Sequence, residues 1–192
     1  MVVEAAPRRV PHPAMSLNRM LRKAESVTLF DRTSTKLTRA VHNVLAGTRT
    51  DAALRGSWLG HPLHPLVVTV PIGAWVCSAA LDLTGQREAA RELVGIGLAL
   101  TPPAVAAGVA DLSHMSLPQR RVGALHAAAN TVAAACYLVS HRRRSAGAHT
   151  EGMVWGMLGL LAVGAGGALG GHLTYALGAG VYQWQGGSRP DH

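Results

Sequence analysis

The chain has 192 residues, of which 48% are hydrophobic and only 15% are charged, compared with about 25% charged residues in an average soluble protein. It contains a single Phe, while small residues such as Gly are abundant, a composition that is typical of membrane helix bundles rather than of a large soluble core. The formal net charge of +8 arises outside the apolar blocks, so it does not indicate a nucleic-acid-binding protein.

Residues 1–57 form a basic arm that carries ten Lys/Arg and four Asp/Glu residues. Its first stretch contains several prolines and lacks the apolar region of a secretory signal, so we expect it to be disordered and not exported. Apolar residues then recur at helical spacing and predict an amphipathic helix near 34–46, with Ser34 as its N-cap. This helix is too polar to cross a membrane. It either lies on the membrane surface or packs on the rest of the protein.

Four apolar blocks follow, each of roughly 18–25 residues, which is close to the ~20 residues needed to cross a bilayer. The expected spans are about 65–83, 93–112, 122–139 and 153–177. The second contains Thr101-Pro102-Pro103, which predicts a kink. We therefore predict an all-α fold, an integral membrane four-helix bundle over residues 58–185, with the basic arm before it and a polar tail at 186–192. A soluble Ala/Gly-rich bundle is the alternative.

Four spans place both ends of the chain on one side of the membrane, called side A here; the opposite side is side B. The basic arm and the missing signal favour a cytoplasmic side A. The run Arg142–Arg144 falls on side B, where we expect it to anchor the topology or to contact lipid headgroups.

Alternation of the spans brings histidines from all four helices toward side A. Ionisable groups at membrane depth are costly and therefore indicate function, and neutral imidazole is the commonest metal ligand. The residues concerned, with the polar neighbours Asn130 and Asp111, are His61, His64, His114, His126 and His172.

Two ligand sites fit this set of residues. A haem b needs two facing imidazoles from different helices, and His126 and His172 are the most deeply embedded candidates. The other cofactor-binding candidates are His61, His64, Asn130 and Asp111. Alternatively, a small transition-metal site is formed by His61, His64, His114 and Asp111.

Structural roles account for the same residues equally well. The histidines of HPLHP then satisfy loop carbonyls beside prolines that suit the first turn of a helix. Asn130 hydrogen-bonds across helices, and Asp111 pairs with Arg121 or caps a turn.

Motifs of catalysis are missing from the sequence. It has no glycine-rich phosphate loop after a strand, no GxSxG and no HExxH, so we expect no catalytic residues. Cys77 and Cys136 lie in apolar runs without metal-ligand spacing, and we interpret them as inert.

Four segments resemble the bacterial membrane proteins classified as domain of unknown function 2231. They are WLGHPLHPLVVTVPIGAW (58–75), AVAAGVADLSH (104–114), RRVGALHAAANTVA (120–133) and GGHLTYALGAGV (170–181). The resemblance covers about residues 53–185 and implies a four-helix domain of the bacterial inner membrane without an established activity. Some relatives are fused to a Rieske iron–sulfur domain, which implies redox work with a separate Rieske-type partner. The positions it selects are His61, His64, Pro71, Asp111, His126, Asn130 and His172.

Our leading hypothesis is a multi-pass membrane protein that binds haem b or another redox cofactor at side A. One alternative is a non-catalytic membrane scaffold or partner subunit with structural histidines, and another is transition-metal binding or transport. The expected partners are the lipid bilayer and a redox protein, and no nucleic acid. The sequence does not indicate the oligomeric state.

Overall fold

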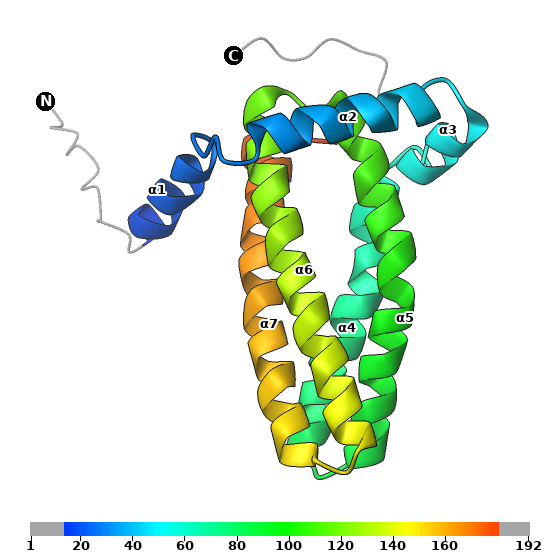
Figure 1. Ribbon diagram of the computed structural model, residues 1–192, viewed down its shortest axis with the longest axis vertical. Helices are drawn as coiled ribbons and strands as arrows, with labels where there is room; N and C mark the ends of the chain where they lie inside the picture. The colour runs from blue at the N-terminus through cyan, green and yellow to red at the C-terminus, as the bar shows by residue number, and fades with distance from the viewer. Residues whose placement is uncertain (1–13, 181–192) are drawn as a thin grey trace, which may run out of the picture.

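The computed structural model describes residues 14–180, so the predictions for the proline-containing start and for the polar tail at 186–192 lie outside the described residues. Within this range the regular elements are helices (Figure 1). A 3-10 turn at Leu112–His114 follows α5, and a π-helical turn at His172–Ala176 follows α7. The helices are α1 (Ala14–Ala24), α2 (Asp31–Leu45), α3 (Arg49–Arg55), α4 (Leu63–Leu83), α5 (Arg87–Asp111), α6 (Leu117–Ser145) and α7 (His149–Gly171).

Helices α4 to α7 form an elongated bundle of two hairpins, and all four are long and apolar enough to cross a membrane (Figure 1). Only 22–28% of the residues in their most apolar stretches are buried inside the protein. The remaining apolar surface needs lipid around it, because water would be an unfavourable solvent for it. The prediction of an all-α membrane protein with four spanning helices is confirmed.

The spanning helices are longer than the apolar blocks because charged residues of the connectors continue the helices. Helix α5 begins at Arg87, and α6 includes the whole run Arg142–Arg144. At side B the chain reverses through short turns in which Gly85 and Gly147 have φ values of 74° and 81°. These positive φ values favour glycine, since other residues rarely adopt them. Helix α5 continues through both of its prolines without a break.

Helix α2 lies across the side-A end of the bundle and buries Ser34 and Val41 (Figure 1). Of the two predicted positions for this helix, the structure therefore has the one packed on the protein. The prediction that Ser34 is the N-cap is wrong, because α2 already begins at Asp31 and the Ser34 hydroxyl donates to the Asp31 carbonyl. Arg121 holds the Asp31 carboxylate, and an acidic residue is favourable in a first helical turn.

The two hairpins, α4–α5 and α6–α7, are structural repeats with an offset of 62 residues. In the first, the Ser78 hydroxyl donates to the carbonyl of Ala90 at 2.8 Å. In the second, the Ser140 hydroxyl donates to the carbonyl of Gly152 at 2.6 Å. Ser140 and Gly152 follow Ser78 and Ala90, respectively, by 62 residues. The turn glycines have the same offset. The four-helix domain is therefore built from one helical-hairpin unit that occurs twice.

Both hairpins run in the same direction, so the axis that relates them runs along the bundle, and equivalent residues meet across it. Trp75 and Tyr137 are equivalent, and their rings stack with centroids 4.1 Å apart and an angle of 12° between the planes. They lie in the core between the hairpins with Val94, Ala133 and Val163. Stacked aromatic rings and apolar contact thus hold the centre of the bundle together.

Near side B a buried ion pair joins another pair of equivalent positions, Asp82 and Arg144. Both terminal nitrogens of Arg144 donate to the Asp82 carboxylate at 2.6 Å, and Arg144 Nε donates to Ser140. The side chains of Arg144 and Asp82 are only 2% and 8% exposed. The expectation that the whole run Arg142–Arg144 reaches lipid headgroups is wrong for Arg144, because Asp82 offers this guanidinium a bidentate partner inside the protein.

The repeat leads to a prediction about this ion pair. Asp82→Ala leaves a buried guanidinium without its partner and should cost about 3–5 kcal/mol of stability. Exchange of the charges, Asp82→Arg with Arg144→Asp, should restore most of this loss only when Ala90→Gly is added. A Cβ on Gly152 would lie 2.4 Å from Cγ of Arg144, and Ala90 is the equivalent of Gly152.

Thermal unfolding in detergent, followed by helical circular dichroism, measures these variants. The control is the exchange without Ala90→Gly. If the exchange with Ala90→Gly is no more stable than Asp82→Ala alone, the two hairpins do not provide equivalent surroundings.

Candidate functional site

The histidines that face each other are His64 of α4 and His126 of α6, which are equivalent residues of the two repeats. Their ring centroids are 6.2 Å apart, and the planes are nearly perpendicular at 83°. Both side chains are half-buried between the hairpins, on the side-A half of the bundle. The structure thus pairs His126 with His64, whereas the sequence-based hypothesis paired it with His172.

Each of the two rings is oriented by a backbone carbonyl of the other helix in its own hairpin. His64 Nδ1 donates to Ala104 O at 2.8 Å, and His126 Nδ1 donates to Gly166 O at 2.8 Å. A carbonyl only accepts, so the proton of a neutral ring lies on Nδ1 and Nε2 carries the free lone pair. Metal-binding histidines are commonly prepared in this way.

Asn130 breaks the equivalence of the two histidines. Its amide nitrogen donates to His126 Nε2 at 3.0 Å and lies equally close to the His126 carbonyl oxygen. The equivalent residue in the first repeat is Val68, which has no donor. Within residues 14–180, His64 Nε2 has no hydrogen-bond partner, so its lone pair is available to a ligand.

Glycines at equivalent positions make room for both imidazoles. A Cβ on Gly108 would lie 2.9 Å from His64 Nδ1, and a Cβ on Gly170 would lie 3.0 Å from His126 Cε1. Gly108 lies one helical turn after Ala104, and Gly170 lies one helical turn after Gly166. Ala104 and Gly166 are the residues whose carbonyls accept from the two rings. The ring edge with Nδ1 and Cε1 therefore lies directly against the neighbouring helix, which fixes the orientation of the ring.

His172 has a different partner, in the N-terminal arm. Its Nε2 lies 2.8 Å from Glu25 Oε1, and its side chain is 9% exposed. Arg121 supports the same junction by donating to the Glu25 carbonyl at 3.2 Å and to the Asp31 carboxylate. The hydrogen bond from Arg121 holds the pKa of Asp31 below its ordinary value of 3.8. His172 thus attaches the arm to the bundle, and Arg121 pairs with Asp31 rather than with Asp111.

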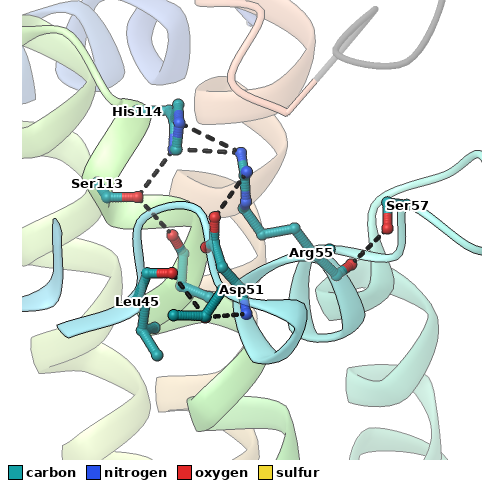
Figure 2. A network of polar contacts seen from close by, with 9 residues as sticks. Leu45, Asp51, Arg55, Ser57, Ser113 and His114 are labelled. Atoms are coloured by element: carbon teal, nitrogen blue, oxygen red, sulfur yellow. Dashed lines mark hydrogen bonds and ion pairs between the residues drawn. The ribbon is translucent and has the colours of Figure 1, made fainter.

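His114 belongs to a polar network between α3 and the end of α5 (Figure 2). Arg55 donates to Asp51 at 2.8 Å and reaches a ring nitrogen of His114 at 3.2 Å. Ser113 contacts the same ring at 2.8 Å. Asp111, at the end of α5, lies in the electrostatic field of Arg55 and Asp51. This network joins the third helix of the arm to the second membrane span.

The proposed metal ligands His61, His64, His114 and Asp111 are not brought together. His61 is exposed, His64 faces His126, and His114 contacts Arg55. Among residues 14–180, no three His, Cys, Asp or Glu side chains lie close enough together to hold a metal ion. The pair His64 and His126 is the part of the sequence-based set that meets across the two hairpins.

Sequence reasoning missed the partners in the interface between the hairpins: Trp75, Tyr137, Asp82 and Arg144. The signal that could have found them is the repeat itself. The residues that recur unchanged 62 positions later include Leu63-His64, Thr69-Val70, Ser78, Gly85, Gly97-Leu98 and Gly108. A search for internal repeats would therefore have aligned each of these residues with its partner.

The glycines beside the imidazoles generate a second prediction. Gly108→Ala or Gly170→Ala pushes the ring off its carbonyl and should destabilise the protein by about 1–3 kcal/mol, as overpacking does. The matched controls are Gly164→Ala and Gly167→Ala, since a Cβ there meets nothing within 4 Å. These should be neutral or stabilising by up to ~1 kcal/mol because alanine favours a helix. Thermal unfolding of all four variants tests this; equal effects at all four positions would contradict it.

Comparison with known proteins gives one family. No curated protein and no solved structure matches the chain. Residues 60–183, which include all four spanning helices, match the model of a family described as predicted membrane proteins, domain of unknown function 2231. The chain is a multi-pass membrane protein and belongs to this family.

Proposed function

We propose that the protein binds haem b within the membrane, where His64 and His126 would hold the iron. The observation that carries this proposal is the facing pair itself. Two imidazoles that share one metal through Nε2, with bonds of about 2.0–2.1 Å each, have centroids roughly 6 Å apart. The observed separation of 6.2 Å agrees with this value.

The hydrogen bonds of the pair support the same role. Both Nδ1 atoms donate to carbonyls, which leaves both Nε2 atoms in the form that binds a metal. His64 Nε2 is free among the described residues, while His126 Nε2 must give up its bond to Asn130. The Asn130 amide remains anchored because it also lies within hydrogen-bonding distance of the His126 carbonyl.

The symmetry of the bundle also favours a ligand that lies on its axis. Equivalent histidines from the two repeats would hold such a ligand between them, as a haem iron with two histidine ligands requires. When bound, haem b would supply an iron that takes up and releases one electron. The chain's own residues would orient the ligands and surround the group with apolar helices. An electron-transfer role requires a separate redox protein as partner.

A second candidate function is a membrane scaffold or partner subunit, and the hydrogen bond from Asn130 favours it. With that bond, His126 has both ring nitrogens satisfied by the protein, as a structural histidine does. In this case each histidine holds the two helices of its hairpin together by donating to a backbone carbonyl, and no cofactor is bound.

We also propose a bacterial inner membrane with side A in the cytoplasm. The basic arm, whose helices α2 and α3 lie at side A, supports this orientation through the positive-inside rule.

Absorption spectroscopy of the protein, purified in detergent after expression with haem supply, tests the haem proposal. We expect a Soret band and, after reduction, the sharp bands of a six-coordinate low-spin haem. His64→Ala and His126→Ala should each abolish the low-spin spectrum, because one axial ligand is lost.

Two histidine variants serve as controls. His172→Ala and His141→Ala should keep the spectrum, because His172 contacts Glu25 and His141 contacts the Arg91 carbonyl at side B. If the purified protein has no porphyrin and takes up none on titration, the haem proposal is wrong. Elemental analysis then distinguishes a transition metal, which His64→Ala would remove, from the scaffold, in which the variants only lower thermal stability.

A further inference from the structure

Helix α1 presents two chemically different faces. Leu17, Met20, Leu21 and Ala24 recur at helical spacing along one face, and Arg19, Arg22 and Lys23 occupy the other. Leu17 and Met20 are 51% and 69% exposed, and the three cations are exposed as well. Within residues 17–23, these two apolar side chains and the three cations are therefore left uncovered by the described part of the chain.

The C-terminal end of α1 is firmly attached to the flank of the bundle. Ala24 is buried in a cluster with Val122 of α6 and Leu173 beyond the end of α7. The next residue, Glu25, contacts His172 through its side chain and Arg121 through its carbonyl. Val122 lies five residues inside α6, or about 8 Å below the start of that helix.

The apolar face of α1 therefore ends in an apolar cluster on the flank of the bundle. Ala24 belongs to this face and is buried against the bundle. From this C-terminal end, α1 leads away from the bundle and lies below the level of α2 (Figure 1). In a membrane this position is the boundary between the headgroups and the acyl chains. A helix with an apolar face and a basic face is the form that binds at such a boundary.

The basic residues of α2 are directed elsewhere. Arg32, Lys36 and Arg39 are exposed and lie on the face opposite Ser34 and Val41, which are buried against the bundle. They consequently point away from the bundle into water. The bilayer is thus a partner for α1, while α2 lies above it.

We infer that α1 is an interfacial anchor that binds the anionic headgroups of the side-A leaflet. Leu17 and Met20 enter the upper acyl region, and Arg19, Arg22 and Lys23 pair with lipid phosphates and other anionic groups at its surface. The contacts of Ala24 and Glu25 orient the helix for this. The inference does not depend on haem binding, because none of these residues contacts His64 or His126.

Fluorescence quenching with the full chain in nanodiscs tests the inference. In a chain with Cys77→Ala and Cys136→Ala, an environment-sensitive probe is attached at Met20→Cys or, as the opposite-face control, at Arg22→Cys. In discs of phosphatidylcholine with phosphatidylglycerol, nitroxide on the acyl chains should quench the probe at position 20 severalfold more than the probe at position 22. Removal of phosphatidylglycerol should reduce this difference.

Charge variants provide the matched comparison. Arg19→Gln, Arg22→Gln and Lys23→Gln together should weaken the quenching at position 20, whereas Arg32→Gln, Lys36→Gln and Arg39→Gln together should leave it unchanged. The inference is overturned if iodide in the buffer quenches position 20 as strongly as a free peptide, whatever the lipid. It is also overturned if position 20 cross-links to position 20 of a second copy, which would make the apolar face a protein interface.

Discussion

The structure depends on one constraint, which is that polar groups inside a lipid-embedded bundle must find their partners within the protein. The protein meets it in two ways. Within each hairpin, a histidine and a serine donate to backbone carbonyls of the neighbouring helix. Between the hairpins, a charged carboxylate meets a guanidinium. Neither kind of contact needs water.

The repeat explains why these contacts occur as they do. In each hairpin, polar side chains donate hydrogen bonds to backbone carbonyls of the same hairpin. Such a unit can occur twice in the chain, because each copy satisfies its own polar groups. Residues on the axis are different, because they meet their own equivalents. Two carboxylates or two guanidinium groups would repel each other there, and the pair Asp82 and Arg144 avoids this repulsion. Two aromatic side chains can meet at the axis although they are alike, since stacked aromatic rings attract each other.

The same reasoning distinguishes His64 from the other polar groups that lie between and within the two hairpins. Ser78, Ser140 and Arg144 have all the partners that their positions demand. His126 is satisfied by Gly166 and Asn130. His64 has its Nδ1 satisfied, while its Nε2 has no partner within residues 14–180. A half-buried imidazole with a free ring nitrogen, 6.2 Å from a second imidazole, is the feature that most strongly favours the proposed ligand on the axis.

The length and apolarity of four segments were enough to predict the membrane bundle, because few structures other than a helix can carry about 20 apolar residues across lipid. Their alternation was also enough to direct His64, His126 and His172 toward one end. Helix ends were predicted less well, since the charged residues near Arg87 and Arg144 continue helices whose apolar cores end earlier. The choice between a surface position and a packed position for α2 needed the structure.

The sequence by itself determined the number of spans, their common direction in the two halves and the presence of imidazoles among them. Only the tertiary structure decided that His126 faces His64 while His172 turns to Glu25. The physical reason is that depth along a helix follows from residue number, whereas the direction of a side chain depends on how the helix is rotated about its axis. That rotation is set by packing, here by glycines that admit the imidazole rings and by the pairs that meet between the hairpins.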